Sequence, residues 1–141
     1  MFVLDYLFTF PEWGPFILRV ALGAAFIAHG YPKLFKNFFG VAGWFDSIGI
    51  RPGTLWALVV GVVEFFGGIV LVLGVFTQLA AFLIAINMLV ALIKVKWGKS
   101  RYVDTARMGW ELDIAYLAMA LALVVLGPGA YSLGGYTPGW Y

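Results

Sequence analysis

A glutamate at the centre of an apolar segment is the residue that most needs a chemical role. Glu64 lies within residues 54–73, a run of twenty residues with no other charged side chain. An ionised carboxylate in hydrocarbon costs roughly 3 kcal/mol or more, so such a residue pairs with a buried partner or lines a wet cavity. The function is therefore expected inside the membrane.

Six more polar side chains complete the candidate set for ligand binding or proton handling: Arg19, His29, Lys33, Asn87, Glu111 and Asp113. The donors in this set suit a ligand carbonyl, and the carboxylates could carry protons if burial raises their proton affinity. Structural roles stay open for all of them. These are a register-fixing Arg19–Glu64 pair, a cap at His29, a snorkelling Lys33, helix glue at Asn87, and start-of-helix charges at Glu111 and Asp113.

Composition decides the class of protein in which these residues sit. Of the 141 residues, 63% are hydrophobic and only 11% are charged, whereas about a quarter are charged in soluble domains. A membrane span takes about 20 apolar residues, which leaves room for four helices. The sequence thus predicts an all-α integral membrane four-helix bundle, with one domain over residues 1–141.

Breaks in the apolar pattern divide the chain into spans at about 15–31, 54–74, 78–94 and 108–127. Pro32 should break or kink the first helix beside His29. The aromatic connection after the first span is expected to form a short amphipathic segment in the membrane interface. Residues 1–14 lack the basic start of a signal peptide and are expected to form an interfacial arm.

Basic residues indicate the orientation of the bundle. Eight of the nine Lys and Arg residues lie in the two long connections, five of them in residues 94–107, and the ninth is Arg19. The positive-inside rule predicts that both long connections are cytoplasmic and both termini are outside the cell membrane. The second basic connection is expected to be a solvated loop.

Helical spacing and depth bring some candidates together. At 1.5 Å per residue, Arg19 and Glu64 lie about 18 and about 15 Å from the cytoplasmic ends of their spans, so they are expected partners. Asn87 lies roughly 10 Å deep by the same measure, and His29 and Glu111 lie near the boundary. The polar set is expected to line a cavity that opens toward the cytoplasm.

Several site classes are excluded by composition. The chain has no cysteine and a single histidine, which excludes disulfides, iron–sulfur clusters held by this chain alone and a three-histidine zinc site, although one haem ligand remains available. No metal site and no intrinsic cofactor are expected. A net charge of +2 with no basic aromatic platform argues against nucleic acid.

Motifs along the whole chain carry a family resemblance. They are residues 18–23, His29-Gly30, residues 33–35, Pro52-Gly53, residues 61–68, Leu73-Gly74, Trp110-Glu111 and residues 127–129 with Ser132-Leu133. With these motifs the chain resembles the DoxX family of small four-helix membrane proteins. It departs from the family pattern at Gly134, where an aspartate usually follows. The family name comes from proteins of thiosulfate oxidation that pass electrons to quinone, so the resemblance implies a quinone-linked role.

The leading hypothesis is a membrane-embedded, redox-associated subunit that binds a quinone or similar lipophilic ligand in a polar cavity. No residue of the chain stores electrons, so a redox partner protein is expected, docked on the basic cytoplasmic loop. The chain would act in a homo-oligomer or a heteromeric complex. A non-enzymatic membrane scaffold or assembly factor is the alternative, and a small-solute carrier is a third hypothesis that four spans and the absence of an inverted repeat disfavour.

Overall fold

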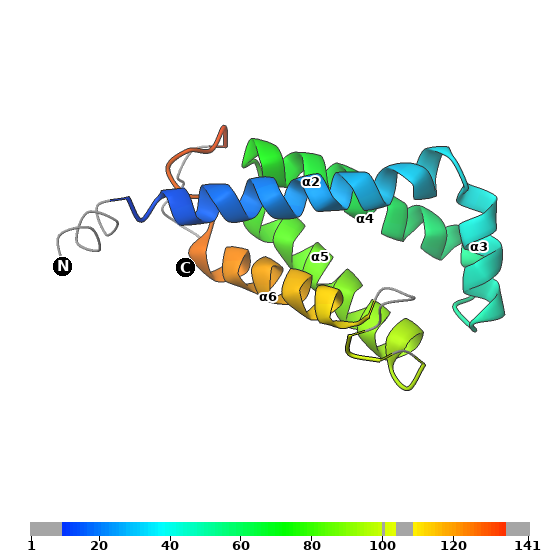
Figure 1. The fold of residues 1–141 in the computed structure, drawn as a ribbon. Coiled ribbons are helices and arrows are strands. Elements are labelled where there is room, and N and C mark those ends of the chain that lie inside the picture. The colour runs from blue at the N-terminus through cyan, green and yellow to red at the C-terminus, as the bar shows by residue number, and fades with distance from the viewer. Residues whose placement is uncertain (1–9, 100, 104–108, 135–141) are drawn as a thin grey trace.

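The structure is a computed structural model, and it describes residues 10–99, 101–103 and 109–134. Its elements are α2 (Trp13–Phe35), α3 (Phe38–Ser47), α4 (Gly53–Leu73), α5 (Thr77–Val90), the π-helical η1 (Ala91–Lys96) and α6 (Glu111–Leu126). The four longer helices run up and down beside one another, and α3 crosses one end of the bundle (Figure 1). The predicted all-helical bundle is confirmed.

Three of the helices in the described ranges are long and apolar enough to span a membrane: α2, α4, and α5 continued through η1 to Lys96. With 16 residues, α6 is about 24 Å long, which is shorter than the roughly 30 Å hydrocarbon core. The predicted fourth span starts at residue 108, which lies outside the described residues. The helix ends where Gly127 adopts a φ of +74°.

The expected break at Pro32 is wrong, because α2 continues through Pro32 to Phe35. The last turns of α2 pack tightly on α4: a Cβ added at Gly30 would lie 2.4 Å from the Phe65 nitrogen, and one added at Gly61 would lie 2.6 Å from Leu34. These contacts hold the segment after the proline in helical conformation. The Pro32 carbonyl then accepts the backbone N–H groups of Lys36 and Asn37 and closes the helix end.

The aromatic connection forms helix α3, as expected for an amphipathic segment. Ala42 and Phe45 are buried against Ala57 of α4, while Phe39 is 80% exposed. The Asp46 carboxylate accepts the Gly53 backbone N–H at 2.8 Å and so caps the start of α4. The position of α3 in a membrane interface stays a prediction.

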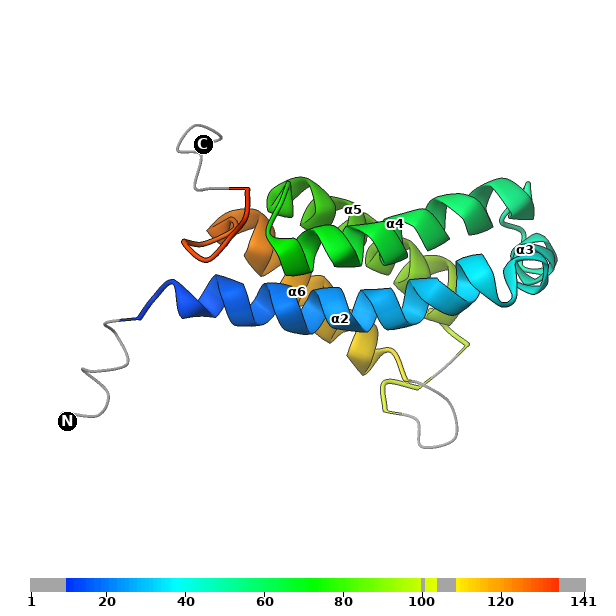
Figure 2. The same ribbon diagram turned by 90° about the horizontal axis from the view of Figure 1, so that it is seen from above.

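The register between α2 and α4 is set by glycines. A Cβ on Gly23 would lie 2.6 Å from the Gly68 carbonyl oxygen, and a Cβ on Gly68 would lie 2.7 Å from the Gly23 oxygen. Only a residue without a side chain permits this backbone approach. Figure 2 shows α2 and α4 side by side along their length. Glycines on both helices thus bring the backbones of α2 and α4 together.

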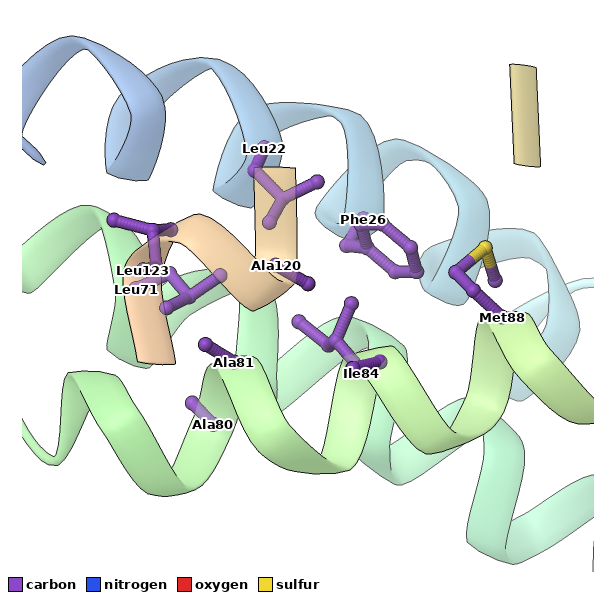
Figure 3. Packing of buried hydrophobic residues seen from close by; sticks show 10 residues of the cluster. Leu22, Phe26, Leu71, Ala80, Ala81, Ile84, Met88, Ala120 and Leu123 are labelled. Carbon is purple, nitrogen blue, oxygen red and sulfur yellow. The ribbon is translucent and has the colours of Figure 1, made fainter. Parts of the chain in front are cut away.

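The main hydrophobic core joins all four long helices. Phe26 and Leu22 of α2 point inward toward Ala81, Ile84 and Met88 of α5, and Ala120 and Leu123 of α6 close the cluster (Figure 3). Small residues at the α5–α6 contact let these two helices approach closely. The core fixes α5 against α2 and α4, which determines where Asn87 projects.

Candidate functional site

Glu64 lies at the junction of three helices and is only 2% exposed. The Lys33 Nζ lies 2.7 Å from Oε1 and 2.7 Å from Oε2, so one ammonium group bridges both carboxylate oxygens. The Asn87 side-chain amide donates to Oε1 at 2.9 Å. A cation from α2, an anion from α4 and an amide from α5 therefore form one polar cluster, which we call the Lys33–Glu64–Asn87 cluster.

Lys33 reaches Glu64 because of the direction of its side chain. Since α2 and α4 are antiparallel and Gly30 packs against the Phe65 nitrogen, Glu64 lies opposite Gly30, three residues before Lys33. Side chains on a helix lean toward its N-terminus, so Lys33 leans back toward this level, and its four-carbon stem covers the remaining distance. Its side chain is 31% exposed. A snorkelling anchor would leave the ammonium at the interface, whereas here it contacts a buried acid.

The expected Arg19–Glu64 pair is wrong. Arg19 lies four residues before Gly23 and so faces Val72, two turns away from Glu64 on α4. Its Nη1 donates to the Leu71 and Val72 carbonyls at 3.2 and 3.3 Å, and its Nη2 donates to the Tyr131 carbonyl. The depth estimate failed because it measured each residue from an assumed end of its span, while the glycine contacts shift α2 along α4.

Arg19 completes the C-terminus of α4. The last carbonyls of a helix lack intrahelical partners and carry partial negative charge, which a cation can satisfy. The Leu133 and Gly134 N–H groups donate to the next two carbonyls, those of Leu73 and Gly74, at 3.0 and 3.3 Å. Arg19 is fully buried and holds the segment after α6 against this end. The geometry gives it a structural role.

His29 lies in an aromatic group beside the cluster. Its ring centroid is 6.3 Å from Phe26 and 6.0 Å from Tyr116 of α6, both in edge-to-face arrangements. On α2, His29 lies one turn before Lys33 and shares its face. His29 is half-buried, and it is the nearest of the remaining candidates to Lys33 along α2.

The two carboxylates of α6 belong to a second polar group, which lies beyond Asn87 at the end of η1. Asp113 lies 2.7 Å from the Lys96 Nζ, which also donates to the Gly109 carbonyl at 3.2 Å. Lys96 was expected in a solvated loop, but its side chain is only 18% exposed because η1 extends α5 to this pair. Glu111 lies beside Gly109 and Tyr102 rather than near Glu64.

The structure thus brings together three of the seven candidates: Lys33, Glu64 and Asn87. Sequence reasoning found all three but not their pairing, since the reach of Lys33 depends on the register of α2. It treated Lys96 as part of the basic connection and missed the pair with Asp113, because sequence spacing does not show which residues meet across a connection. Within the described ranges, no group of three His, Asp or Glu side chains could hold a metal ion.

Comparisons with known proteins give a consistent picture. The model of the DoxX family matches residues 14–97. An uncharacterized protein of Haemophilus influenzae is 32% identical over 117 residues, covering 82% of this chain and 84% of its own length. "Putative oxidoreductase CatD" of Bacillus subtilis is 31% identical over 110 residues, with 78% and 79% covered. "Uncharacterized membrane protein Rv3486" of Mycobacterium tuberculosis is 29% identical over 132 residues, with 82% and 76% covered. No solved structure matches the chain significantly.

Proposed function

The chain belongs to the DoxX family of membrane proteins, and on this basis we propose that it is a redox-associated subunit whose Lys33–Glu64–Asn87 cluster binds the head group of a quinone or a similar lipophilic ligand. The observation that carries the proposal is the carboxylate of Glu64, buried near the middle of α4 and shared by donors from two other helices. One relative, CatD, has a name that describes an oxidoreductase.

The hydrogen-bonding capacity of the cluster suits a ligand carbonyl. An ammonium group has three donors, and two acceptors, the oxygens of Glu64, contact Lys33 among the described residues. The third N–H is available to a carbonyl oxygen. The Asn87 amide uses its nitrogen toward Glu64, which leaves its oxygen to accept from a ligand hydroxyl. A quinone carbonyl and the corresponding quinol hydroxyl would thus both find partners.

Proton transfer follows from the same contacts. A quinone takes up two electrons and two protons when it becomes a quinol. The Lys33 ammonium can donate one proton to a ligand oxygen and regain it from water, since its side chain is 31% exposed, and water supplies the second proton. The chain supplies no electron carrier of its own, so a partner protein supplies the electrons. The basic connection after α5 is the surface on which we place that partner.

A membrane scaffold is the competing function, and the same cluster motivates it. A buried ion pair could serve only to specify how α2, α4 and α5 assemble. The two functions differ in what they predict for a ligand. In a scaffold, the Lys33–Glu64 pair serves only the assembly of the helices, and no quinone binds. In a quinone-binding subunit, the same charged pair is needed to bind the quinone.

The test is co-purification of a quinone. The protein is purified in mild detergent, extracted with solvent and analysed by mass spectrometry for a prenyl quinone, with and without quinone supplied. Wild type should carry stoichiometric quinone, and Glu64→Gln should lose it while staying folded. Lys36→Met is the matched control, since Lys36 lies on the next turn, where its ammonium lies over the Tyr31 ring and away from Glu64. Folded wild type that stays empty after quinone is supplied would rule the proposal out.

A further inference from the structure

An apolar groove runs between α4 and α5. It has a volume of about 240 Å³, and all of its lining residues are apolar. Gly67 and Ala80 are its smallest lining residues and lie on facing helices, which is why a hollow forms there. One end lies at Phe76 in the α4–α5 turn, and the other reaches Val63 and Leu83.

The far end of the groove leads to the Lys33–Glu64–Asn87 cluster. Val63 is the residue before Glu64, and Gly67 follows Glu64 by one turn on α4. Leu83 precedes Asn87 by one turn on α5. Since the Asn87 amide donates to Glu64 at 2.9 Å, the helix pair that forms the groove also forms the polar contact at its end. On α4 the lining residues Val63 and Gly67 lie on either side of Glu64 in the sequence, so the cluster lies beside this end of the groove.

The size and chemistry of the groove favour a hydrocarbon chain. Pockets that hold a whole drug-sized ligand measure about 300–1,000 Å³ and contain a few polar groups. This groove is smaller, and no polar side chain lines it, so a carbonyl-bearing ring would lose its hydrogen bonds there. A flexible chain has no such requirement.

We propose that the groove holds the apolar tail of the ligand whose head group binds at the Lys33–Glu64–Asn87 cluster. The inference rests on the proposed function and narrows its ligand class to membrane-resident quinones with a prenyl or alkyl tail. The tail runs from Leu83 toward Phe76 along the groove. Because lipid is as apolar as the groove, the tail is positioned by packing rather than by transfer out of water.

Gly67 allows the groove to be filled without disturbing the helices. A Cβ at this position would meet only the Ile84 side chain, at 3.6 Å from Cδ1 and 3.8 Å from Cγ1, which is ordinary van der Waals contact. Gly67→Leu therefore places a side chain in the groove and leaves the backbone in position. Ala24→Leu is the matched control, because it adds the same side chain at an exposed position of α2.

The experiment uses a benzoquinone with an alkyl tail that ends in a photoreactive diazirine, added to the full chain in lipid nanodiscs. Crosslinked residues are mapped by mass spectrometry, and head-group binding is measured in parallel with the same benzoquinone without a tail. Wild type and Ala24→Leu should crosslink at the groove, and excess decyl benzoquinone should compete. Gly67→Leu should lose the crosslink and keep tail-less binding.

Crosslinks scattered over the lipid-facing helices, unchanged by Gly67→Leu, would overturn the tail inference while tail-less binding still supports the head-group site. The same holds for a groove crosslink that decyl benzoquinone does not displace, since the groove then takes up any apolar chain without selecting a quinone tail. If the tail-less benzoquinone fails to bind folded wild type, the proposed function fails and the inference fails with it.

Discussion

Replacing Lys33 by methionine should destabilise the bundle far more than replacing its near neighbour Lys36. Lys33→Met keeps most of the side-chain volume but leaves the Glu64 carboxylate, 2% exposed, with Asn87 as its remaining partner. Removing one partner of a buried ion pair costs about 3–5 kcal/mol because the other charge stays uncompensated. The Lys33 side chain is 31% exposed, so we expect the low end, about 3 kcal/mol.

The free energy of unfolding is measured by SDS titration in mixed micelles, followed by circular dichroism. Neutralising the acid as well should recover most of the loss, because Lys33→Met with Glu64→Gln leaves a neutral amide that Asn87 can still contact. Lys36→Met should change stability little, since Lys36 is exposed. Equal losses in Lys33→Met and Lys36→Met, or a double variant as unstable as Lys33→Met alone, would refute the ion pair as drawn.

The remaining predictions concern packing, the end of α4 and orientation. Gly68→Ala should lower the free energy of unfolding by about 1–3 kcal/mol, because the added Cβ would press on the Gly23 oxygen. Gly43→Ala is the control and should leave the free energy of unfolding unchanged, because nothing lies within 4 Å of a Cβ there. Equal effects of the two substitutions would contradict the glycine contact. Arg19→Met should lower the free energy of unfolding by about 1.5–3 kcal/mol in the same titration, because it removes charged hydrogen bonds to carbonyls. The amount of quinone extracted with the protein should not change. Loss of quinone at unchanged stability would instead give Arg19 a role in ligand binding. In single-cysteine variants of this cysteine-free chain, a membrane-impermeant maleimide applied outside cells should label residue 10 and spare residue 99; the reverse pattern would invert the predicted orientation.

Sequence patterns predicted the helices, because the length of an apolar segment is a local property. The end of α2 was predicted four residues early, at residue 31 instead of Phe35. A proline shows in the sequence that a backbone N–H is missing, but the packing of Gly30 and Leu34 on α4, which outweighs that loss, does not show there. The same tertiary contact decided the site. Which cation contacts Glu64 depends on how far α2 is shifted along α4. This shift results from contacts between the two helices, so the sequence pattern of either helix alone does not predict it.

The same logic explains why Arg19 attracted the wrong assignment. A buried arginine and a buried glutamate in one bundle suggest a pair when only charges are counted. A helix end, however, offers several carbonyls with partial negative charge, and these satisfy a guanidinium without any acid. Sequence shows the charged side chains but hides the backbone groups that a helix leaves unpaired. Arg19 could be placed only once the end of α4 was known.

Arg19 donates its hydrogen bonds to backbone carbonyls and not to Glu64, so the presence of a buried glutamate needs another explanation. The register of α2 on α4 is already set by backbone contacts at Gly23, Gly30 and Gly68, each too close for a side chain. A buried ion pair adds desolvation cost, and it is redundant for a register that the backbone already fixes. A scaffold would therefore lose little if Lys33 and Glu64 were both neutral. A ligand-binding subunit would keep its fold in the double variant and lose its quinone. The double variant therefore tests quinone binding without the uncompensated buried charge that Lys33→Met leaves.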